Sequence, residues 1–452
     1  MSTLEHWLQR YNAGRDALPG AGVPWLDALR EEAIMRFADE GWPSNRLENW
    51  RHTSLALLEE RSFAPAAAPL APEAVLQRLR RDGEEAAGGH WLVFVDGRHA
   101  PALSELGALP GGAEICSLAE VLATHPDWVE AYFGTVEEGA SPAALNAALA
   151  TDGAFVRLAR GVALDAPLHV VFIGGVREGA SLVRNLIVAE AGAEATIVEH
   201  YVGVEGAGDV QAGAAAAGTA GALTNAVTRI AAAQDARITH LKLQEEDRST
   251  VHVAQIAAVQ ARGSVFASHS LSFGAQLARN DITTRFDGEG CEALLNGLFH
   301  VDGRRHVDHH TRIDHAQPRG TSREFYRGVL DGAGRGVFAG RILVAPGAVR
   351  TDAMQRADNL LLSPQAEADA RPELEIYADD VKCAHGSTVG QIDEDSLFYL
   401  RTRGLDEAHA RNLLTYAFAA EVLERIGLAP LKRRAQAAIR ARLPGGELME
   451  AL

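Results

Sequence analysis

The chain is poor in cysteine. Its 452 residues contain only Cys116, Cys291 and Cys383, which stand far apart in the sequence and form no CxxC pair. Three widely spaced cysteines do not suit a disulfide framework, because a framework needs cysteines in pairs. Free thiols are typical of a reducing compartment, so we expect a cytoplasmic protein.

Long apolar runs and an excess of positive charge are lacking as well. No stretch of about 18 consecutive apolar residues is present, and the first residues lack a basic segment followed by an apolar run. We therefore expect neither a membrane span nor an export signal. The formal net charge is -17. Nucleic acid binding relies on basic side chains that replace counterions, so the sequence predicts no nucleic acid partner.

Short strand-like segments broken by Gly and Asp turns dominate from about Val156 to Gly390. Three of them recur at an interval of 27 residues, beginning at Asp235, Arg262 and Glu289. This period is typical of one coil of a parallel β-solenoid, in which each coil buries its inward residues by stacking on its neighbours. The Gly- and Ala-rich run 203–221 interrupts the spacing, and we expect it to be a loop inserted between coils.

Helical periodicity marks both ends of the chain. Residues 1 to about 60 are helical in pattern, and an Ala- and Pro-rich linker follows at 62–72. A helix is predicted over 406–426 with Asp406 as its N-cap, and a second over 431–443. We therefore divide the chain into a mainly helical region with a linker (1–150), a mainly β core (151–393) and a C-terminal helical region (394–452).

The second C-terminal helix carries a basic cluster on an otherwise acidic chain. Its members are Lys432, Arg433, Arg434, Arg440 and Arg442. Such a cluster favours a solvated face, and the alternative is a surface for an acidic partner.

A thiol and an imidazole stand two residues apart in the segment LEIYADDVKCAHGSTVG, residues 374–390. If the segment is one strand, Cys383 and His385 share a face and can meet one metal ion together. The spacing alone is weak evidence, and it favours a buried thiol beside an ordinary hydrogen-bonded histidine.

Five histidines gather in HVDGRRHVDHHTRIDH, residues 300–315. In an extended segment, His309 and His315 face one way while Asp308 and His310 face the other. His309 and His315 would lie roughly 20 Å apart, too far to share an ion. The pattern favours a hydrogen-bonded network over a metal site.

An enzyme is the competing hypothesis, since parallel β-solenoids also occur among hydrolases and lyases. Such an enzyme would use paired carboxylates, or Cys383 as a nucleophile with His385 as its base. Asp379 and Asp380 are adjacent and project to opposite faces of a strand, which suits an acid and base pair poorly. No nucleophile elbow or oxyanion-hole loop is evident around Cys383.

Several segments together resemble the SufB/SufD family of iron–sulfur cluster assembly proteins. They are GWPSNRLENWRHTSL, HVDHHTRIDH, RGVLDGAGRGVFAGRILV, TDAMQRADNLLLS, YADDVKCAHG, DEDSLFYLRTRGL and NLLTYAFAAEVL. The likeness covers most of the chain, and the form YADDVKCAHG is that of the SufD members, because SufB members are expected to carry a glutamate-rich variant there. An ordered series of this kind is far more specific than one short motif.

The resemblance implies a right-handed parallel β-helix flanked by helical regions, and a scaffold subunit without catalytic activity. It implies pairing with a SufB-like β-helix subunit, and docking of a SufC-like ABC-type ATPase on the C-terminal helices. The ATPase anchors would be among Leu413, Leu414, Phe418, Val422 and Leu423.

Iron or a nascent iron–sulfur cluster would lie at the interface with SufB, with His385 as the primary ligand from this chain and Cys383 as the secondary one. A cluster normally needs four ligands, mostly thiolates, so the partner must supply the others. The sequence leaves open whether a flavin joins the complex and whether the isolated chain forms a homodimer.

Overall fold

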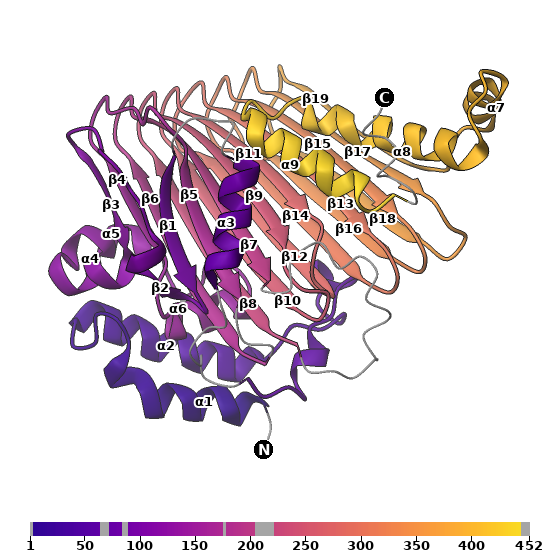
Figure 1. The fold of residues 1–452 in the computed structure, drawn as a ribbon. Coiled ribbons are helices and arrows are strands. Elements are labelled where there is room, and N and C mark those ends of the chain that lie inside the picture. Colours follow the sequence, from indigo (N-terminus) through magenta and orange to yellow (C-terminus); the bar gives the residue numbers. More distant parts are fainter. Residues whose placement is uncertain (1–2, 64–71, 84–88, 175–177, 204–220, 444–452) are drawn as a thin grey trace.

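The fold is a parallel β-solenoid with helices at both ends (Figure 1). The computed structural model describes residues 3–63, 72–83, 89–174, 178–203 and 221–443. The loop predicted at 203–221 lies outside this part of the chain, except for its two end residues. The solenoid strands alternate between two sheets, so that each coil contributes one strand to each sheet. The predicted fold class is therefore confirmed.

One sheet has ten strands in the order β19-β17-β15-β13-β11-β9-β7-β5-β1-β2. Their bounds are β1 His90–Val95, β2 Arg98–His99, β5 Leu168–Gly174, β7 Glu194–Gly203, β9 Arg237–Glu245, β11 Val265–Ser272, β13 Glu292–Val301, β15 Thr321–Leu330, β17 Asp352–Leu361 and β19 Lys382–Gly390.

The second sheet has nine strands in the order β18-β16-β14-β12-β10-β8-β6-β4-β3. Their bounds are β3 Ala113–Ser117, β4 Ala154–Leu158, β6 Ala180–Ala189, β8 Leu223–Ala232, β10 Val251–Gln260, β12 Leu277–Phe286, β14 His306–His315, β16 Arg335–Val344 and β18 Glu367–Ile376.

In-register stacking explains why these segments form strands. Ile238, Phe266 and Ala293 are partners on β9, β11 and β13, and all three are buried in the core between the sheets. They come from the segments that recur every 27 residues, so the repeat marks successive coils. Because inward positions stack on the same position of the next coil, apolar residues at these positions form a continuous core.

Helices cover the outer faces of the solenoid. Their bounds are α1 Thr3–Gly14, α2 Pro24–Glu40, α3 Pro72–Gly83, α4 Leu118–Thr124, α5 Asp127–Phe133, α6 Ser141–Leu149, α7 Glu394–Thr402, α8 Glu407–Leu423 and α9 Ala429–Arg440. In Figure 1, α3 and α9 lie side by side on the first sheet, and α2 packs on α6 at the opposite side. As predicted, Asp406 caps α8 and accepts a hydrogen bond from the His409 backbone. Among the described residues, no helix combines the length and apolar character that a membrane crossing needs.

Two expectations need correction. Residues 374–390 are not one strand: β18 ends at Ile376, and β19 begins at Lys382 in the other sheet, after a turn in which Asp380 has a φ of 53°.

The basic cluster is not simply a solvated face. Arg434 on α9 forms a largely buried ion pair with Glu245, with 2.6 Å between Nη2 and Oε2. The Arg442 guanidinium lies over the Phe273 ring.

Candidate functional site

The candidate site lies on β19, the last strand of the solenoid. In the register with β17, Cys383 pairs with Ala353 and His385 pairs with Gln355. Ala353 and Gln355 are buried and face the core, whereas Met354 between them is exposed. Cys383 and His385 therefore occupy inward positions of the last coil, and the prediction that they share one face is confirmed.

The last coil is open on one side. Both β19 and β18 are edge strands, and most of their residues are exposed or half-buried. The exposed residues include apolar ones that would be interior if another coil followed: Val389 is 50% exposed and Ile376 is 42% exposed. His385 is exposed at this end. An edge strand also presents backbone N–H and C=O groups without strand partners.

Cys383 is half-buried and packs against the core. Burial is the main cause that raises the pKa of its thiol above the ordinary value. A thiol of this kind is mainly protonated at neutral pH, which weakens the nucleophilic enzyme hypothesis, although a bound metal ion can still displace its proton. Asp379 and Asp380 are exposed in the turn before β19.

The histidine cluster on β14 follows the predicted alternation. His309 faces the core, with its Nε2 3.3 Å from Ser272 Oγ, and His315 Nε2 is 2.9 Å from Ser322 Oγ. His310 lies on the outer face and contacts Asp308 at 3.1 Å. Burial lowers the pKa of His309 to about 3 and that of His315 to about 4. Within the described ranges, no three His, Cys, Asp or Glu side chains converge as metal ligands would.

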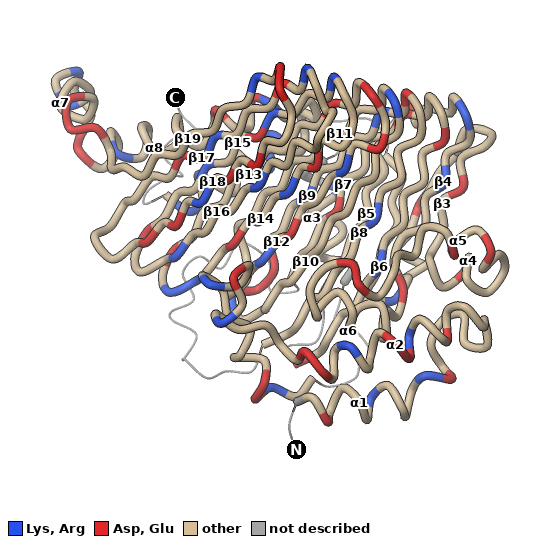
Figure 2. The backbone as a smooth tube through the Cα atoms, turned by 180° about the vertical axis from the view of Figure 1, so that it is seen from behind, with Lys and Arg blue, Asp and Glu red and all other residues tan. Residues whose placement is uncertain are grey.

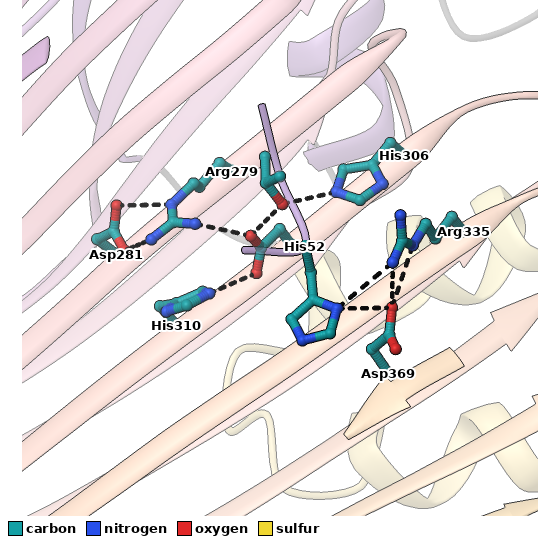
Figure 3. A network of polar contacts seen from close by, with 9 residues as sticks. His52, Arg279, Asp281, His306, His310, Arg335 and Asp369 are labelled. Carbon is teal, nitrogen blue, oxygen red and sulfur yellow. Dashed lines mark hydrogen bonds and ion pairs between the residues drawn. The ribbon is translucent and has the colours of Figure 1, made fainter. Parts of the chain in front are cut away.

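An N-terminal segment, residues 48–58, crosses the outer face of β12, β14 and β16 (Figure 3). We call it the strap. Thr53 donates to the buried carboxylate of Asp308 and lies 2.7 Å from His306. Arg279 forms ion pairs of 2.8 Å with both Asp281 and Asp308.

Further along the strap, His52 lies 3.2 Å from Asp369 on β18, and Asp369 also pairs with Arg335 at 2.7 Å. The strap thus connects the N-terminal region to the last coil. Sequence reasoning missed this contact, because the partners lie more than 200 residues apart and no periodic pattern links them.

The outer face of β16 and β18 carries both signs of charge (Figure 2). Arg341 pairs with Glu375 at 2.6 Å. These strands therefore place both cations and carboxylates near the open end, and the surface there is not dominated by charge of one sign.

The interior of the solenoid also holds buried polar residues. The Lys242 ammonium lies 2.8 Å from His252 Nε2 and faces the Tyr201 ring at 5.0 Å. Burial lowers the pKa of Lys242 to about 8. Nearer the open end, Glu324 is fully enclosed, and burial raises the pKa of its carboxyl to about 7. The sequence did not predict that Lys242 and Glu324 are buried, because a single polar residue at an inward position cannot be told from one at an outward position.

A second surface feature lies between α7, which projects beyond the last coils, and α8, which packs on β13 and β15 (Figure 1). A hollow of about 560 Å³ is lined by Asp395, Ser396, Tyr399, Leu400, Leu413, Leu414 and Ala417. The side chains of Phe398 and Tyr399 on α7 are 68% and 56% exposed. By contrast, Val422 and Leu423 on α8 are fully buried against the solenoid.

Comparison with known proteins matches almost the whole chain. Residues 172–418 match the model described as SUF system FeS cluster assembly, SufBD core domain, and residues 1–170 match the SufBD protein N-terminal region. The iron–sulfur cluster assembly protein SufD of Escherichia coli is 32% identical over 92% of this chain and 93% of its own length. The SufD of Bacillus subtilis is 25% identical over 91% and 92%, and the chloroplastic protein ABCI7 of Arabidopsis thaliana is 26% identical over 90% and 84%.

Proposed function

Because the chain belongs to the SufBD family of the SUF iron–sulfur cluster assembly system, we propose that it is a non-catalytic scaffold subunit that supplies His385 to a nascent cluster. Cys383 is the secondary ligand. The cluster is cargo that the scaffold builds and passes on. A flavin has no assigned place in this proposal.

The observation that carries the proposal is the position of the two donors at the open end of the solenoid. An imidazole nitrogen and a thiol sulfur are ligands that iron accepts. Two donors are too few for a cluster, and here they lie on an exposed edge strand. A site with incomplete ligation on an edge suits completion by a second protein.

The partner at this edge is a SufB-like β-helix subunit. Unpaired backbone groups of β18 and β19 can pair with strands of a second solenoid, as in other cases of strand addition. The exposed apolar side chains of the last coil, Ile376 and Val389, would be buried by such a partner. Association of this type would place the partner's ligands beside His385 and Cys383.

The second partner is a SufC-like ABC-type ATPase, which binds the hollow between α7 and α8. Exposed aromatic side chains beside an apolar hollow are typical of protein interfaces. Of the anchor residues expected from the sequence, Leu413 and Leu414 line the hollow. Val422 and Leu423 are used for packing on the solenoid and are not available to a partner.

The test is to coexpress the chain with its SufB-like and SufC-like partners and to measure iron and sulfide in the purified complex. His385→Ala should reduce both at least tenfold without changing subunit stoichiometry, because it removes the primary ligand. Cys383→Ser should have a smaller effect. Ser387→Ala is the matched control, since Ser387 lies two residues further along the same inward face of β19.

Normal iron and sulfide in the His385→Ala complex would exclude His385 as the ligand. A loss in Cys383→Ser as large as in His385→Ala would make Cys383 a primary ligand.

A further inference from the structure

A short column of polar residues lies in the last coils of the solenoid interior and ends at His385. Glu324 on β15 pairs with Gln355 on β17, and Gln355 pairs with His385 on β19. Because parallel strands in register stack equivalent residues, these three side chains occupy one inward position in three successive coils. Glu324 and Gln355 are 3% and 1% exposed.

The Gln355 amide is fixed from below and from the side. Its Nε2 donates a hydrogen bond to Glu324 Oε2. Gly340 on the opposite sheet leaves room for the amide, since a Cβ atom at that position would lie 2.0 Å from Gln355 Nε2. The glycine therefore permits a large polar side chain at this place in the interior.

The carbonyl oxygen of the same amide, Gln355 Oε1, is buried and has no hydrogen-bond partner within the described part of the chain. A buried acceptor without a donor is unfavourable, because it has given up its hydrogen bonds to water, so native structures rarely leave one unpaired. The next residue in the column is His385, whose Cα lies one strand spacing away, about 4.8 Å.

A neutral imidazole carries one N–H donor and one acceptor nitrogen. When the acceptor nitrogen binds a metal, the N–H usually donates to a carbonyl or carboxylate, and this bond sets the tautomer and the ring orientation. An unpaired amide oxygen one coil below a ligand histidine is an acceptor of this kind.

We propose that Gln355 is the positioning residue for His385: its Oε1 accepts the N–H of the neutral imidazole, and Glu324 holds the amide in place. The hydrogen bond leaves the other ring nitrogen free at the open end for iron. Its use in cluster building rests on the function proposed above, whereas the bond itself does not.

The test reads the His385 tautomer by nitrogen-15 NMR of the full chain labelled on histidine, with the His385 signals assigned by their absence in His385→Ala. Spectra are recorded at about pH 8.5, where free model imidazoles are neutral. One tautomer should dominate in the wild type. Both should appear in Gln355→Leu, because the acceptor is gone.

Two further variants separate positioning from packing. Exchanging the two groups, as Glu324→Gln with Gln355→Glu, keeps their mutual hydrogen bond and an acceptor below His385, so a single tautomer should return. Gln260→Leu removes another buried glutamine, whose amide donates to Glu292 O at 2.9 Å, and it should leave the His385 signals unchanged.

An unchanged single tautomer in Gln355→Leu would overturn the proposal, as would a mixture of tautomers in the wild type. If Gln355→Leu does not fold, Gln355→Asn withdraws the amide by one methylene and is judged in the same way. In the complex, Gln355→Leu should raise the Fe²⁺ concentration for half-maximal loading about 10- to 100-fold. Normal loading by His385→Ala would refute the proposed function but leave the tautomer result intact.

Discussion

The pKa of a buried carboxyl group in this molecule depends on whether a cation faces it. Burial alone would raise the pKa of Asp308, but His310 and Arg279 outweigh burial and hold that pKa well below the ordinary value. The neutral side chains of Thr311 and Gln355 lie beside Glu324, and burial raises the pKa of its carboxyl to about 7. A carboxyl group therefore loses its proton more readily than usual at Asp308 and less readily than usual at Glu324.

The pKa of Glu324 predicts a pH-dependent stability. The folded carboxyl has a pKa of about 7 against an ordinary value of 4.5, so the folded state binds more protons between these values than the unfolded chain does. The free energy of unfolding must then fall as the pH rises from 4.5 to 7. Glu324→Gln removes this contribution. Its stability relative to the wild type should improve by roughly 3 kcal/mol between pH 4.5 and 8, at about 1.4 kcal/mol per pKa unit.

Urea unfolding at both pH values measures this difference. Glu373→Gln is the control, because Glu373 is half-buried on β18 and is not enclosed in the interior. A constant difference between Glu324→Gln and the wild type across this range would show that the Glu324 carboxyl titrates normally.

At the scale of elements, alternation along a strand was predictable from sequence. The inward and outward faces of β14 and the shared face of Cys383 and His385 follow from the two-residue period alone. The partition of residues 374–390 between two sheets was not predictable, because the turn at 377–381 lacks glycine and proline. The packing of α9 on the solenoid was not predictable either. Its Arg434 pairs with Glu245, a residue almost 200 positions away. Contacts of that range leave no local pattern.

Helix α7 provides the element-scale prediction. Replacing Phe398 and Tyr399 together with alanine should lower recovery of the ATPase in a pull-down at least tenfold, because Tyr399 lines the hollow and Phe398 is exposed next to it on α7. The melting temperature should change little, since an exposed side chain contributes little packing.

The matched control is Val422→Ala on α8. Its side chain is fully buried against the solenoid, so the substitution should destabilise the protein by about 0.5–2 kcal/mol while the folded chain still recovers the ATPase. Equal ATPase recovery by the α7 double variant and the wild type would place the contact elsewhere.

Across the whole molecule, the strap joins parts that are distant in sequence. Trp50 on the strap lies under the Arg279 guanidinium, with 3.7 Å from Cζ to the ring centroid. Arg279 is 1% exposed and is paired with two aspartates. One arginine on β12 thus fixes both the strap and the carboxylate network below it.

Arg279→Met should cost about 3–5 kcal/mol, because it removes the buried guanidinium that pairs with the buried carboxylate of Asp308. The strap should also open locally more often in this variant. Hydrogen exchange of amides in residues 48–58 should accelerate more than exchange in β9 or β11. Arg285→Met serves as the control, since Arg285 pairs with Asp287 on the exposed surface and should change stability by less than about 1 kcal/mol. Uniform acceleration over the whole chain would show that Arg279 stabilises the solenoid generally and not the strap.

The two ends of the solenoid are not equivalent. At the far end from His385, the sheets finish in β2, which is two residues long, and in β3, which pairs antiparallel with β4. Short and antiparallel edges are poor templates for another parallel coil. The open end of one copy therefore finds no receptive opposite end on a second copy, and head-to-tail polymerisation is blocked. Contact between the open ends of two copies uses both open ends. Assembly along the solenoid axis therefore stops at a pair and cannot grow into a fibre.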